Sequence, residues 1–156
     1  AYFIVAGLVF TALSEPFLES EFGADWERKA PVEMVRWTTQ EHAESVDQQL
    51  VVLSQVLAHD LTMGYESLEN LLLETVGGVR VRNLRHALEL TKSCEGPYLR
   101  FGLQHNQMLI LRADSAKAAT PEVLEKHGIP VAQSPDLTTS LKTSVCHLAG
   151  DSPTPY

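Results

Sequence analysis

The chain has 156 residues, a length that suits one compact domain. Hydrophobic residues make up 44% of it and charged residues 21%, which is the balance of an ordinary globular protein. The formal net charge is −8 and there is no basic run, so a surface for nucleic acid is not expected. Cys94 and Cys146 form no C-x-x-C motif, so the sequence indicates neither a disulfide framework nor a zinc ribbon.

The first 13 residues, AYFIVAGLVFTAL, carry no charged side chain. This run ends at Glu15-Pro16 and is shorter than the roughly 18 apolar residues that a membrane span needs. It also lacks the basic start and the cleavage site of a signal peptide. We therefore predict two strands, YFIV and LVFTAL, on either side of Ala6-Gly7, where the glycine marks a close approach of the backbone. Because the chain does not begin with Met, we expect a fragment of a longer protein.

Residues 14–47 are charged and poor in strand formers, which indicates an insertion laid over the domain. Pro31 is placed to open a short helix that runs to about Trp37, since proline is tolerated at the first helical position. We expect Trp26 and Trp37 to pack within this insertion, because aromatic side chains dominate cores.

The next elements are strands. Residues 48–58 form a continuous apolar run rich in β-branched side chains, which predicts a buried strand. A second strand is expected at 71–76, followed by a tight turn at Gly77-Gly78 and a brief return strand at 79–81.

A helix follows, with Asn83 as its N-cap and Lys92 in its last turn, before Gly96-Pro97 stops it. Its apolar positions recur at helical spacing and predict one stripe facing the core, formed by Leu84, Ala87, Leu88 and Thr91.

Apolar and polar residues alternate along 98–113, which predicts a β-hairpin. A second helix is then predicted to begin with Thr120 as cap and Pro121 at the first position, and to stop at Gly128. From about residue 138 we expect a loosely held tail. The count of about six strands and three helices predicts an α+β domain built on a small, mainly antiparallel sheet or partial barrel.

The sequence carries no recognisable catalytic motif: G-x-S-x-G, H-E-x-x-H and the phosphate-binding loop are all absent. None of the six histidines is spaced as a metal ligand set would be, so neither a metal nor a cofactor is expected. His59-Asp60 suggests a catalytic dyad, but neighbours on a strand point to opposite faces, and a surface or cap role is expected instead. Cys94 lies near a helix C-terminus, which does not activate a thiolate, so we expect a buried structural cysteine.

One arrangement does suggest binding. An apolar-Gly-apolar loop joins two strands, and its backbone N–H groups can converge on a carboxylate. The strand after the loop, with a helix beside it, can accept an extended peptide as an added strand. The alternative is that Gly7 only relieves a bend and that the helix only fills the core.

Several stretches of the sequence carry a resemblance to a known family. LETVGGVRVRNLRHALEL (73–90) resembles the PDZ signature, with Gly77 in place of the usual Asn, and FIVAGLVF (3–10) resembles the carboxylate-binding loop of HtrA/Deg proteases. Residues 2–26, 48–71 and 124–137 extend the likeness, together with LRFGL. From about Tyr2 to Leu137, the chain resembles the second, C-terminal PDZ domain of plant-type Deg (Do-like) serine proteases.

The resemblance implies a PDZ-like, small antiparallel partial barrel with flanking helices over residues 1–137. It would carry an insertion at about 14–47, an extra C-terminal helix and a flexible tail at 138–156. The parent would be an ATP-independent serine endopeptidase. This piece would itself be non-catalytic, because the nucleophile motif G-x-S-G-G is missing.

The resemblance also implies a peptide groove. Its carboxylate-binding loop would consist of Val5, Ala6, Gly7 and Leu8. Its receiving strand would consist of Val9, Phe10 and Thr11. Across from that strand, His86 and Leu90 would complete the groove, although a plain surface histidine fits His86 equally well. We expect a bulky residue at Gly7 to abolish binding.

The resemblance leaves two functions open. A third, an independent enzyme, is not expected, because the sequence has no residues that could carry catalysis. The chain is either an assembly module that contacts other protomers of the same protease, or a recognition module that binds C-terminal peptide segments of other proteins. Exposed apolar residues in the insertion, such as Phe17, Leu18 and Trp26, would favour assembly, and an empty groove would favour recognition. The compartment is left open among nucleus, mitochondrion and chloroplast.

Overall fold

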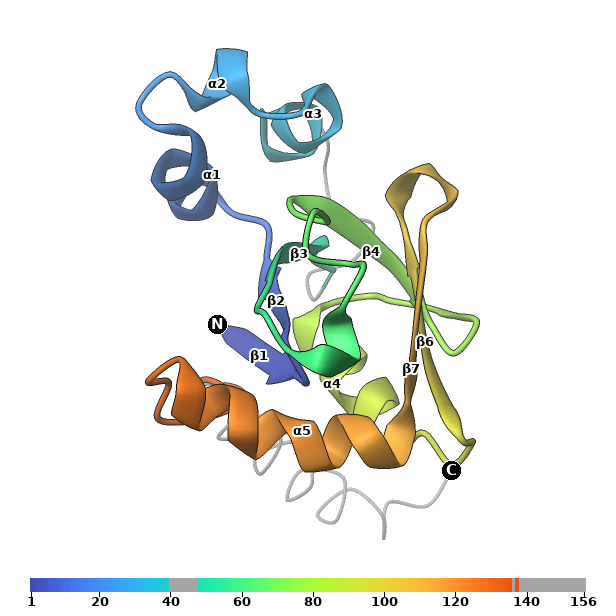
Figure 1. Ribbon diagram of the computed structural model, residues 1–156. Helices are drawn as coiled ribbons and strands as arrows, with labels where there is room; N and C mark the ends of the chain where they lie inside the picture. Colours follow the sequence, from blue (N-terminus) through green and yellow to red (C-terminus); the bar gives the residue numbers. More distant parts are fainter. Residues whose placement is uncertain (40–47, 136, 138–156) are drawn as a thin grey trace, which may run out of the picture.

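The computed structural model describes residues 1–39, 48–135 and 137 of the chain (Figure 1). Within these residues, seven strands form one antiparallel sheet in the order β1-β2-β3-β4-β6-β7, with β5 paired to β4. The sheet does not close, since β1 and β7 are its two ends. The strands are β1 (Tyr2–Val5), β2 (Leu8–Ala12), β3 (Val51–Val56), β4 (Leu71–Val76), β5 (Val79–Arg80), β6 (Tyr98–Leu103) and β7 (Met108–Arg112).

Five α-helices flank this sheet in the described part of the chain, so the predicted α+β class with an antiparallel partial barrel is confirmed. They are α1 (Glu15–Phe22), α2 (Trp26–Lys29), α3 (Val32–Thr39), α4 (Leu84–Lys92) and α5 (Ala113–Lys126). The count exceeds the predicted three helices because α1 and α2 were not foreseen. None of the described helices is long and apolar enough to cross a bilayer.

The main core lies between the sheet and helices α4 and α5. Side chains alternate along a strand, so every second residue of β6 and β7 points into this core. The rings of Phe3, Phe10 and Phe101 stack across three strands, with centroids 5.1 and 5.2 Å apart. Helix α4 adds the predicted stripe of Leu84, Ala87, Leu88 and Thr91, all of which are buried.

The predicted start of α4 is confirmed. The Asn83 side chain accepts a hydrogen bond from the His86 N–H at 2.8 Å, which satisfies one of the orphan donors of the first turn. The predicted hairpin is also present, as β6 and β7, and the Gly77-Gly78 turn joins β4 to β5 with positive φ at both glycines.

The predicted start of α5 is wrong. This helix begins at Ala113, seven residues before Thr120, so Thr120 is not a cap and Pro121 lies inside the helix. The alanine-rich turns before Thr120 have high helix propensity and follow directly from β7. The end of the helix is as predicted, because Gly128 adopts a φ of 68° and its N–H donates to the Glu125 carbonyl.

Helices α1, α2 and α3 form the predicted insertion, and Figure 1 shows them together at the opposite end of the view from α5. Leu18, Ala30 and Met34 build a small second core against Val52 of β3. Ser14 caps α1 by accepting from the Phe17 N–H at 3.2 Å, a signal that the sequence analysis missed.

The apolar residues of the insertion whose exposure would favour assembly are largely covered, so the insertion does not supply that argument. Leu18 is fully buried, and Phe17 and Trp26 are half-buried against the second core. Packing of Trp26 within the insertion is confirmed, and Trp37 is half-buried. Residues 40–47 of the insertion and the tail from 138 lie outside the described residues.

Candidate functional site

The predicted receiving strand, β2, is paired along both of its edges. On one side it pairs with β3, and on the other it pairs with β1 in a register that matches Phe3 with Phe10 and Val5 with Leu8. In antiparallel pairs, alternate residues direct their backbone groups to opposite edges. At the two ends of β2, Leu57 N–H donates to the Gly7 carbonyl and Leu13 N–H donates to the Leu50 carbonyl. The backbone groups of the odd-numbered residues of β2 therefore point toward β3. Leu8 and Phe10 therefore face β1, so β1 covers the edge at which a peptide would add.

Strand β1 runs in the direction that a bound C-terminal peptide would take. It is antiparallel to β2, and its C-terminal end leads directly into the Ala6-Gly7 loop. Its outer edge is also engaged, because Ile4 N–H donates to the Ala132 carbonyl at 2.7 Å and Ser134 N–H donates to the Tyr2 carbonyl at 2.9 Å. The first strand of the chain thus takes the place of a ligand strand and is held there on both sides.

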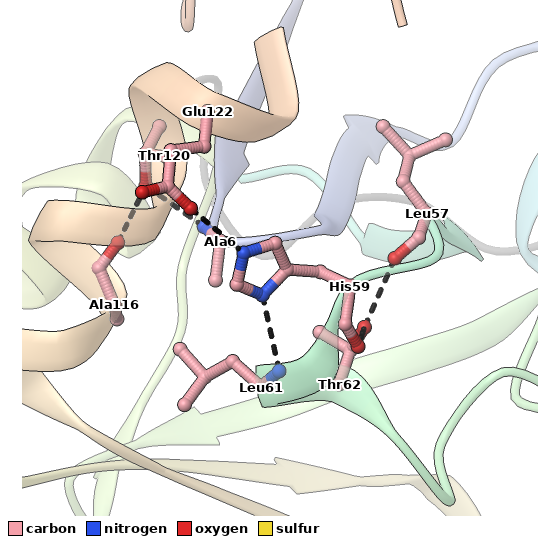
Figure 2. Close-up of polar contacts among 8 residues, drawn as sticks. All are labelled: Ala6, Leu57, His59, Leu61, Thr62, Ala116, Thr120 and Glu122. Carbon is pink, nitrogen blue, oxygen red and sulfur yellow. Dashed lines mark hydrogen bonds and ion pairs between the residues drawn. The ribbon is translucent and has the colours of Figure 1, made fainter. Parts of the chain in front are cut away.

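The predicted carboxylate-binding loop is a two-residue hairpin turn buried beneath α5. Ala6 is fully buried with a φ of 58°, and its N–H donates to the Thr120 Oγ1 at 2.9 Å. The Thr120 hydroxyl in turn donates to the Ala116 carbonyl at 2.8 Å (Figure 2). One of the backbone donors expected to meet a carboxylate is therefore already bonded within the protein.

Gly7 is required by a close approach of the backbone, as its sequence context suggests. A Cβ at this position would lie 2.5 Å from the Leu57 carbonyl oxygen and 3.2 Å from the Thr62 methyl carbon. Thr62 is itself fully buried, and its hydroxyl donates to the Leu57 carbonyl at 3.0 Å. The loop thus packs against the turn that follows β3, and a bulky residue at Gly7 acts on the fold as well as on any groove.

His59 joins that turn to α5 (Figure 2). Its Nδ1 accepts from the Leu61 N–H at 3.0 Å, and its Nε2 lies 3.2 Å from a carboxylate oxygen of Glu122. His59 and Asp60 do not lie on a strand, contrary to the sequence argument: His59 is the N-cap of a short 3-10 turn, Asp60–Thr62. The expected cap role of His59 is confirmed.

The two predicted groove residues on α4 are half-buried. The His86 Nδ1 accepts from the Arg82 N–H at 3.1 Å, and Leu90 packs against the main core. Neither lines the apolar cavity that lies between β1, α4 and α5. The α4 residues that do line it are Leu88, Thr91 and Lys92, of which the sequence analysis assigned the first two to the core.

This cavity, of about 320 Å³, is lined almost entirely by apolar surface. Strand β1 contributes Ile4 and Val5, and α5 contributes Lys117, Thr120, Pro121 and Leu124. It lies beside β1 and not between β1 and β2, so it leaves the paired edge of β2 closed.

No cluster of three or more histidine, cysteine or carboxylate side chains suited to a metal occurs in the described part of the chain. Cys94 is half-buried rather than fully buried as expected, and its Sγ lies 3.4 Å from the Tyr98 carbonyl oxygen. The backbone edges of β1 and β2 are already paired within the chain, so this site offers chiefly apolar contact.

The chain is similar to parts of longer plant proteases. It is 36% identical to the chloroplastic protease Do-like 2 of Arabidopsis thaliana over 88% of its own length and 22% of the relative. It is 33% identical to the mitochondrial protease Do-like 4 of the same plant, over 87% of its own length and 23% of the relative. The chain thus spans less than a quarter of either relative. The PDZ domain model matches residues 1–136, and with the sheet, the hairpin loop and α4 in place, the chain belongs to the PDZ domain family.

Proposed function

We propose that this chain is a non-catalytic PDZ module of a Deg/Do-like serine endopeptidase and that it serves in assembly and regulation of that protease. The observation that carries this proposal is the pairing of β2 with β1, because the edge that would receive a free C-terminal peptide is taken by the chain itself. Such a module contacts other protomers through surfaces other than the paired edge of β2.

Several contacts support a permanent role for β1. Phe3 is buried in the main core, and Ile4 is buried on the opposite face of the strand, so β1 supplies side chains as well as backbone groups. A peptide that replaced β1 would have to break its pairing with β2 and its bonds to residues 132–134. It would also have to replace the Phe3–Phe10 ring contact at 5.1 Å.

Recognition of C-terminal segments is the second candidate, favoured by the apolar cavity beside β1. Such a cavity takes one apolar side chain of a ligand, and Lys92 and Lys117 at its lining suit a carboxylate. The cavity offers no free strand edge, so a ligand there would be bound through its side chain, and more weakly than by strand addition.

Size-exclusion chromatography with light scattering, repeated with a panel of C-terminal peptides, tests the proposal. We expect a species heavier than the monomer to form as concentration rises, and the peptides to leave it unchanged. A monomer at every concentration that binds the peptides would overturn assembly in favour of recognition.

A further inference from the structure

The two edge strands of the sheet, β1 and β7, differ in what covers their outer edges. At one end, β1 is covered by residues 132–134, which bond to its outer edge. At the other end, β7 pairs only with β6, and no other described strand lies along it. Proteins usually guard a bare edge with lysine, proline or a bulge. Strand β7, with the sequence MLILR, has no lysine or proline, its one charged side chain, Arg112, is the last residue of the strand, and its register with β6 is regular.

The backbone groups along this edge can be assigned from the register. Leu103 N–H donates to the Gln107 carbonyl and Ala113 N–H donates to the Pro97 carbonyl, so the odd residues between them bond to β6. In an antiparallel pair the intervening residues point the other way. The N–H and C=O groups of Met108, Ile110 and Arg112 therefore project outward from the sheet.

The side chains of the same three residues are exposed, with Met108 at 50% and Ile110 at 44%. Tyr98, on the neighbouring strand, is 48% exposed and lies opposite Arg112. Exposed apolar side chains beside unpaired backbone groups mark a sheet edge prone to pair with another strand.

We propose that β7 is an interface strand that pairs antiparallel with β7 of a second copy of this chain, about a two-fold axis at Ile110. This inference rests on the proposed role in assembly and names the surface that performs it. In this register Ile110 faces Ile110 of the second copy, and Met108 faces Arg112. Every outward N–H and C=O of the three residues then meets a partner, which makes the edge complementary to itself.

The charges along β7 agree with this register. Like charges directly opposite each other weaken a strand pair, and here Arg112 meets methionine and not arginine. The Arg112 guanidinium also has a carboxylate nearby, since its Nε lies 3.8 Å from an oxygen of Asp114. A register shifted so that Arg112 faced its own copy would bring two guanidinium groups together, and it would leave Met108 unpaired.

The interface is expected to be weak in the isolated chain. Five paired residues bury less than the roughly 800 Å² per partner of a stable interface. Association should therefore depend strongly on concentration. Linkage to a second contact elsewhere in a larger assembly would raise its effective strength.

Backbone amide exchange, followed residue by residue by NMR from micromolar to millimolar protein, tests this pairing together with light scattering. We expect the amides of Met108, Ile110 and Arg112 to become protected as the chain associates. The amides of Leu109 and Leu111, which already bond to β6, should be protected throughout. This alternation distinguishes strand pairing from a side-chain contact or a general loss of solvent access.

Four variants complete the experiment. Ile110→Pro removes an outward donor without touching the β6 ladder, and Ile110→Lys adds a charge at the centre, so both should abolish association. If the proline variant fails to fold, the lysine variant still tests whether β7 forms the interface. Ile110→Val should associate as the parent does, and Val32→Lys, at an exposed apolar residue of the insertion, should leave association unchanged.

The failures of the two proposals are distinguishable. Association that survives both Ile110 variants, or that leaves the three outward amides unprotected, overturns the β7 interface while assembly stands. A chain that stays monomeric up to millimolar concentration overturns both.

Discussion

The Ala6 N–H donates a hydrogen bond to the side-chain oxygen of Thr120 across 2.9 Å, and this bond ties the hairpin turn at the start of the chain to the middle of α5. Both groups are covered by protein, since Ala6 is fully buried and Thr120 is half-buried. Because Thr120 also donates to the Ala116 carbonyl, its hydroxyl is used as acceptor and as donor. The loop expected to bind a carboxylate is thereby held by the chain's own helix.

The first prediction concerns this hydroxyl. Thr120→Val keeps the shape of the side chain but leaves the buried Ala6 N–H without an acceptor, which costs about 1–3 kcal/mol of unfolding free energy. Thr120→Ser keeps the hydroxyl and should lose much less. Urea unfolding of the three proteins measures the difference, and equal losses for valine and serine would contradict the assigned role.

Gly7→Ala should destabilise the fold by about 1–3 kcal/mol, because the added methyl group meets the Leu57 carbonyl and inserting atoms into a packed site forces the backbone to shift. Thermal unfolding by circular dichroism is the measurement. Gly96→Ala is the matched control, because a Cβ there meets nothing within 4 Å. An unchanged midpoint for Gly7→Ala would contradict the close approach.

His59 is predicted to act as a cap and not as a catalytic group. His59→Ala should cost about 1 kcal/mol through loss of the acceptor for the Leu61 N–H, and His59→Asn should recover part of it. Glu122→Gln should cost well under about 1 kcal/mol, because the Glu122 side chain is 72% exposed and exposed ion pairs contribute little. Chemical denaturation of the three variants ranks them, and a larger loss for Glu122→Gln would reverse the interpretation.

A disulfide tests whether β1 ever leaves β2. Tyr2 and Thr11 face each other in a pair whose backbone groups point away from one another, since those of Tyr2 bond to Ser134. Such a pair suits a disulfide between Tyr2→Cys and Thr11→Cys. We expect the oxidised variant and the parent chain to bind C-terminal peptides equally weakly.

The reduced form of the same variant is the control for that experiment. Titration of a labelled peptide, read by fluorescence anisotropy, compares the three states of the protein. Binding by the parent and by the reduced variant that disappears on oxidation would show that β1 yields its place to ligands, and it would favour recognition over assembly.

Much of the fold can be predicted from local sequence patterns. Alternation predicted β6 and β7, a continuous apolar run predicted β3, and the Asn83 cap with its apolar stripe predicted α4, because each signal lies within a few consecutive residues. The start of α5 was missed because Thr120-Pro121 carries a strong cap signal of its own, and the helix propensity of the residues before it overrides that signal. The cap of α1 is a local signal as well, because Ser14 is of a residue type favoured at N-caps and directly precedes the helix.

The sequence by itself determined the α+β class, the strand–loop–strand at the start of the chain and the family resemblance that the PDZ match confirms. Only the tertiary structure decided that β1 covers the edge of β2, that Thr120 holds the Ala6 turn and that no strand of the described residues pairs with the outer edge of β7. Each of these features depends on contacts between residues far apart in the chain, or on which strands lie at the edges of the sheet. Local propensity carries no information about such pairings, because they are chosen by the packing of the whole sheet.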